Sequence, residues 1–321
     1  MPAETKVRSI VKMQTVSVSF CMASTGLGYS AFIGLQQLSS SYYTAWIFGG
    51  ILAILLYAVC SFGYRKLPIS SWPGWLKLGL AALGAGYCLA VCAAFLSSSI
   101  SLWTDWAMEN TPFWAFAVLL SVAVGYGSYC GKKAVLRLSV LSLFVLLLIA
   151  VIDTLMLLPD IQLDRLRGFP NEMTASLLPA SFKVAALLLL PLPAVFILLN
   201  DADFIRGNHK SIGLGVALLV LWLVIAAVRS VLLLGVLIQL DGYPMISSLM
   251  EADAGIGLVR LEYLGVLAMM NIIIVGAMGI LCAVKICLNK ICPSFINGWK
   301  NIFLPAAVFL LMIFGKYVLA L

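Results

Sequence analysis

The chain has 321 residues, of which 63% are hydrophobic and 10% are charged, and its formal net charge is +7. Soluble domains carry about 25% charged residues, so this chain is too apolar to cover a water-facing surface and is predicted to be an integral membrane protein. We expect no nucleic-acid binding, because the excess cations can face the anionic lipids of a cytoplasmic leaflet.

Nine apolar stretches are long enough to cross about 30 Å of hydrocarbon as helices. They cover about residues 10–36, 44–63, 76–98, 112–129, 135–158, 179–200, 211–239, 257–286 and 300–320. None shows the alternating pattern of a membrane barrel, and the first is too long for the apolar region of a signal peptide. The sequence therefore predicts an all-α polytopic helix bundle, with residues 1–321 forming a single transmembrane domain.

The basic residues gather in alternate loops. Fourteen of the 20 Lys and Arg residues lie before span 1 or in the loops between spans 2 and 3, 4 and 5, 6 and 7, and 8 and 9. The acidic residues, such as Asp105, Glu109, Glu172 and Asp241, lie in the opposite loops. By the positive-inside rule, this asymmetry predicts a cytoplasmic N-terminus.

Motifs for metal binding or catalysis are missing from the sequence. The eight cysteines form no C-x-x-C pair, and His209 is the only histidine, so no zinc-site spacing exists. No phosphate-binding loop, dinucleotide fingerprint or nucleophile motif is found either. We therefore expect a protein that is not an enzyme and that needs no metal or cofactor.

The middle of the first span is unusually polar and rich in glycine. Ser24, Thr25, Gly26 and Gly28 lie near its centre. Glycine and hydroxyl residues at this depth indicate either close helix packing or a break that lines a cavity.

A second break is predicted in the sixth span, where Pro191, Leu192 and Pro193 lie near the centre. Two prolines remove two backbone donors from a helix. Tyr87 in span 3 and Asn271 in span 8 lie at a similar depth, and each can be either a ligand contact or a hydrogen bond between helices.

Spans 1 and 6 open the two halves of the chain, about residues 1–158 and 159–321, and enter the bilayer from opposite sides. Discontinuous helices at matching positions of inverted halves predict a binding site at the midplane. Freed N–H groups attract a carboxylate, and freed carbonyls attract an ammonium group. This chemistry suits a small zwitterion such as an amino acid.

Two charged residues lie within spans, Asp153 in span 5 and Arg229 in span 7. An ionisable group inside a membrane is a functional hypothesis by default. Arg229 can alternatively extend to the outer interface.

The chain resembles the B-subunit family of spore germination receptors (GerAB-type), which belongs to the amino acid–polyamine–organocation superfamily of transporters. Gly26-Leu27-Gly28 followed by YSAF is similar to the family's break in helix 1. The most distinctive likeness is Tyr243-Pro244 followed by Arg260-Leu261-Glu262, which we interpret as structural motifs. The chain departs from the family in having no proline soon after the first break and no glycine or acidic residue at the second.

The resemblance implies an inverted-repeat transporter fold and a subunit that senses a germinant, typically an L-amino acid. It also implies the spore inner membrane as the location and partnership with the receptor's A and C subunits. The family has ten spans, whereas nine are predicted in this chain. The second half of the chain would then lack the last helix of the family's fold. Two alternatives are a secondary amino-acid permease and an inactive, truncated paralogue.

Overall fold

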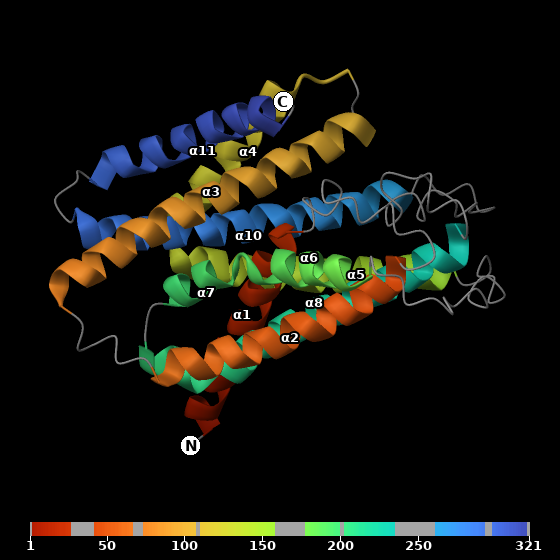
Figure 1. The fold of residues 1–321 in the computed structure, drawn as a ribbon, viewed down its shortest axis with the longest axis horizontal. Coiled ribbons are helices and arrows are strands. Elements are labelled where there is room, and N and C mark those ends of the chain that lie inside the picture. The colour runs from red at the N-terminus through yellow and green to blue at the C-terminus, as the bar shows by residue number, and fades with distance from the viewer. Residues whose placement is uncertain are drawn as a thin grey trace.

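The computed structural model describes residues 2–26, 42–66, 73–106, 110–157, 177–199, 202–234, 261–292 and 297–319. Within these ranges every regular element is a helix (Figure 1). The helices are α1 (Pro2–Ser24), α2 (Tyr42–Lys66), α3 (Gly74–Trp106), α4 (Phe113–Cys130), α5 (Lys132–Leu157), α6 (Leu177–Leu189), α7 (Leu192–Leu199), α8 (Ala202–Leu234), α10 (Leu261–Ile291) and α11 (Asn297–Leu319).

Seven segments of the described chain are long and apolar enough to cross a membrane. They are Thr44–Phe62, Gly74–Ser101, Phe113–Cys130, Lys132–Leu155, Leu177–Leu199, Asn208–Leu234 and Leu264–Ile291. The apolar part of α11 is shorter than these seven segments and covers Ile302–Gly315. The prediction of a polytopic helical membrane protein is thus confirmed, whereas the count of nine spans and the transporter fold stay predictions.

The helices form two groups with α10 between them (Figure 1). On one side α2 packs against α6 and α8, and on the other α11 packs against α3 and α4. The central helix α10 contacts α1, α3, α4, α5 and α7. It is also the most enclosed of the seven candidate spans, because 72% of its apolar stretch is buried within the protein. We therefore regard α10 as the structural centre of the bundle.

Many large apolar side chains remain exposed on the outer helices. Leu55 and Val59 of α2, Leu83 of α3 and Leu119 of α4 are examples. A soluble monomer rarely exposes so much apolar surface to water. In a bilayer the same side chains contact lipid tails, and this contact costs no free energy of hydration. The outer faces of these helices are therefore suited to lipid.

Helix α1 crosses the interior, and the hydroxyls of its buried Thr15, Ser17 and Ser19 are bonded within the helix. Phe20, Cys21 and Met22 are fully buried. The hydroxyls of Thr15 and Ser19 donate to the backbone carbonyls four residues earlier, at 2.8 and 2.7 Å. This local bonding lets polar residues lie in an apolar core.

Candidate functional site

The α-helix of α1 ends at Ser24, and Thr25 and Gly26 continue as a 3₁₀ turn. The Ser24 hydroxyl donates to the carbonyl of Cys21 and the Thr25 hydroxyl to that of Met22, both at 2.7 Å. Carbonyls in the last turn of a helix lack partners within the helix, so these two hydroxyls cap the end of α1. Gly28 lies outside the described residues.

The sixth span is two helices rather than one. α6 ends at Leu189, residues 190–191 form a turn, and α7 begins at Leu192. The Leu190 N–H still bonds to the Ala186 carbonyl at 2.8 Å, which completes the last turn of α6. The interruption therefore lies at the proline pair that predicted it.

The prolines also decide which backbone groups the break leaves without helical partners. Because proline has no N–H, the carbonyls of Leu187 and Leu189 lack the donors that Pro191 and Pro193 would otherwise supply. On the other side, the N–H groups of Ala194 and Val195 both bond to the Pro191 carbonyl, at 3.1 and 3.4 Å. The break is thus richer in acceptors than in donors.

The two interruptions lie against each other. A Cβ atom added at Gly26 would lie 2.6 Å from the carbonyl oxygen of Leu187, closer than real Cβ atoms approach. Glycine is therefore required for the end of α1 to reach α6 at this point. The carbonyl that Gly26 contacts is one that a proline deprives of its donor.

Tyr87 of α3 joins the same place. Its hydroxyl donates a 2.6 Å hydrogen bond to the carbonyl of Leu190, within the turn between α6 and α7. Of the two roles that the sequence allows, the structure shows the hydrogen bond between helices. A contact of Tyr87 with a ligand stays a prediction.

Asn271 lies half-buried in α10, five residues before Gly276. Gly276 is where α10 meets the end of α1, because a Cβ atom there would overlap the carbonyl of Cys21 and the Thr25 methyl group. At about 1.5 Å per residue, Asn271 lies roughly 7.5 Å along the helix from that contact. The structure therefore places Gly276, which the sequence analysis missed, closer to the break than Asn271. Glycines at 276 and 279 are the signal that could have identified this contact.

Asp153 and Arg229 are brought together, but away from the break. They line one cavity between α5, α8 and α10, together with Trp222 and Met269. Asp153 is only 6% exposed. The two charges that the sequence places in separate spans thus form one site.

The residues that carry the family resemblance fall mostly outside the described part of the chain. This holds for Tyr243, Pro244 and Arg260. Glu262 is the second residue of α10, and its side chain is not among those described. Their structural role stays a prediction.

Within the described ranges, no group of three or more His, Cys, Asp or Glu side chains is placed to hold a metal ion. The arrangement offers backbone carbonyls, a tyrosine hydroxyl and, in the separate cavity, one acid and one guanidinium. These groups can bind polar solutes. Comparison with protein-family models and with the sequences of curated proteins finds no match for this chain.

Proposed function

We propose that this chain is the germinant-sensing membrane subunit of a spore germination receptor, which binds a small zwitterion, an L-amino acid, where α1 ends beside the α6–α7 break. The observation that carries the proposal is the contact of Gly26 with the Leu187 carbonyl, whose helical donor is removed by Pro191. Interrupted helices that meet inside a bundle are a feature of solute-binding membrane proteins.

The chemistry of the break favours the ammonium group of the ligand. α1 and α6 both end here, whereas only the eight-residue α7 begins here. Because a helix carries partial negative charge at its C-terminal end and partial positive charge at its N-terminal end, the two C-terminal ends outweigh the one N-terminal end. The prolines add acceptors without adding donors. An amino acid would therefore present its ammonium group to the carbonyls of this break.

Binding at this place would be coupled to movement of α1. Gly26 lies against the Leu187 carbonyl, so a ligand can reach that oxygen only when the end of α1 moves away. A ligand that binds only the separated arrangement shifts the population toward it. Such a shift is what the partner A and C subunits, implied by the family resemblance, would detect.

An amino-acid permease is the second candidate, because helices interrupted in matching spans are also the basis of alternating access. Sodium coupling is not favoured, since residues 257–285 contain no Ser or Thr for an ion site. Uptake of radiolabelled amino acids into proteoliposomes that contain only this chain separates the two. Robust, saturable uptake would overturn the proposal of a pure sensor.

The proposed function is tested in spores. Deletion of the gene should abolish or delay germination with one amino acid from a panel of amino acids and sugars, and leave the other germinants effective. Spores with Gly26→Leu should show the same defect while immunoblots detect normal amounts of the chain. Normal germination of both strains with every germinant would contradict the proposal.

A further inference from the structure

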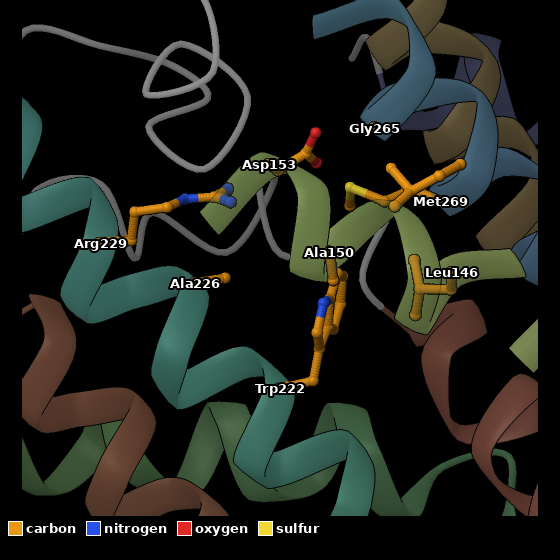
Figure 2. Close-up of a pocket in the computed structure, with 9 residues that line it drawn as sticks. Leu146, Ala150, Asp153, Trp222, Ala226, Arg229, Gly265 and Met269 are labelled. Atoms are coloured by element: carbon orange, nitrogen blue, oxygen red, sulfur yellow. The ribbon is translucent and has the colours of Figure 1, made fainter. Parts of the chain in front are cut away.

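The cavity between α5, α8 and α10 contains opposite charges that do not pair directly. Figure 2 shows the Arg229 guanidinium extending from α8 toward α5, and the Asp153 carboxylate on α5 pointing away from it. Both residues are described, and no direct ion pair joins them. A buried carboxylate and a half-buried guanidinium in the same cavity, with no direct bond between them, leave room for a third group.

The guanidinium has an unused donor. Arg229 Nε is buried and has no hydrogen-bond partner among the described residues. A buried donor without a partner costs free energy, and guanidinium groups pair best with planar anions through two parallel N–H donors. A carboxylate is therefore the group whose chemistry best matches this donor.

The surroundings make the charges effective. Leu146, Trp222 and Met269 form apolar walls of the cavity, and electrostatic attraction is stronger in such a low-dielectric environment than in water. The cavity volume is about 30 Å³. Since a water molecule needs roughly 10–15 Å³ measured in this way, the space as it stands holds two or three waters. A solute of five heavy atoms, such as glycine, has to displace these waters and requires the flexible Arg229 and Met269 side chains to move outward.

The balance of charge selects the ligand. A simple anion would meet the Asp153 carboxylate as well as Arg229, and a simple cation would meet Arg229 as well as Asp153. A molecule with one carboxylate and one ammonium group, a short distance apart, matches both. We infer that the cavity lined by Asp153 and Arg229 is a second binding site, for the head group of a small zwitterionic amino acid such as glycine.

This site is separate from the break at Pro191, and the inference holds whether or not that break binds a ligand. Asp153 lies near the last residue of α5, Arg229 near the end of α8, and Gly265 near the start of α10. These ends are opposite to the ends that carry most of the basic residues. In the proposed orientation, the cavity therefore lies toward the outer surface.

The test uses the full chain in lipid nanodiscs and radiolabelled glycine as the probe. We expect saturable binding, for which acetate and methylamine compete at least roughly tenfold more weakly than unlabelled glycine, because each supplies only one of the two charges. This comparison needs no variant. Equal competition by acetate and glycine would overturn the inference.

Variants then assign the binding to the cavity. Arg229→Gln and Asp153→Asn should each weaken glycine binding at least roughly tenfold, and Arg229→Lys should weaken it less than Arg229→Gln because it keeps the charge but loses the planar fork. Arg137→Gln, an exposed cation on the opposite end of α5, is the matched control and should bind as the unmodified chain does.

Gly26→Leu distinguishes this inference from the proposed function. It alters the break but not the cavity, so glycine binding that depends on Arg229 should remain. Binding that persists in folded Arg229→Lys and Asp153→Asn variants at the affinity of the unmodified chain would overturn the inference and leave the proposed function intact.

Discussion

The hydroxyl of Tyr87 donates a 2.6 Å hydrogen bond to the carbonyl of Leu190, and so connects α3 to the turn between α6 and α7. In a continuous helix this carbonyl would accept from the N–H of Ala194, but that N–H bonds to the Pro191 carbonyl instead. Tyr87 therefore replaces a hydrogen bond that the break removes.

Tyr87→Phe should lower the stability of the bundle. The substitution keeps the ring but removes the donor to Leu190, and a typical hydrogen bond contributes about 0.5–1.5 kcal/mol. Because Tyr87 is 40% exposed, we expect the loss in free energy of unfolding to lie near the lower end of this range. Thermal unfolding in nanodiscs measures it. Tyr129→Phe, which alters an exposed tyrosine of α4, is the control. Equal stability of both variants would show that the hydrogen bond to Leu190 contributes nothing.

Gly26→Ala should destabilise the contact between α1 and α6. The new Cβ would lie 2.6 Å from a backbone oxygen, and overpacking of this kind costs about 1–3 kcal/mol. Gly79→Ala in α3 is the matched control, because nothing lies within 4 Å of its Cβ position, and alanine favours a helix over glycine. Thermal unfolding of both variants gives the comparison. A stable Gly26→Ala chain would mean that the two interruptions are not in contact.

Gly276→Ala should have a similar or larger effect, at the interface between α1 and α10. Its Cβ would overlap the carbonyl of Cys21 and the Thr25 methyl group, and backbone cannot rotate away as a flexible side chain can. We expect a loss of about 1–3 kcal/mol or more, measured by thermal unfolding. Gly315→Ala in α11, where the Cβ position is open, serves as the control and should unfold at the same temperature as the unmodified chain or slightly above it, because alanine favours a helix over glycine.

Pro191→Ala should reduce function without reducing stability. The substitution restores an N–H that can bond to the Leu187 carbonyl, and it removes one of the two proline rings that interrupt the helix, so that only Pro193 remains. Hydrogen exchange of residues 187–195 should slow, and the germination response should fall at least roughly tenfold. Pro305→Ala in α11, a proline within a helix far from the break, controls for proline removal as such. An unchanged germination response together with slower hydrogen exchange would show that the break in the sixth span is not needed for function.

Composition and local chemistry predicted much of this molecule. A chain with 63% hydrophobic residues is expected to be a membrane protein. Its apolar surface is unfavourable in water and favourable in hydrocarbon. The interruption at Pro191 is equally local, since a missing N–H and a steric clash belong to the proline itself. The seven candidate spans of the structure fall within or near stretches read from apolar runs alone.

Other expectations depended on contacts that no local pattern specifies. The sequence does not reveal that the hydroxyls of Ser24 and Thr25 donate to carbonyls of their own helix, and a contact of either residue with a ligand stays a prediction. Asn271 is predicted as a ligand contact or a hydrogen bond between helices from its depth in a span, and this stays a prediction. Depth does not say which way a helix is rotated, so the contact of Gly276 with α1 does not follow from it.

The sequence by itself determined that the chain lies in a membrane, that it is helical and where the sixth span is interrupted. These features follow from the properties of single residues and of apolar runs along the chain. Only the tertiary structure decided that Gly26 contacts the Leu187 carbonyl and that Asp153 shares a cavity with Arg229. The physical reason is that each of these pairs joins helices far apart in the chain, and their meeting depends on how the whole set of side chains packs.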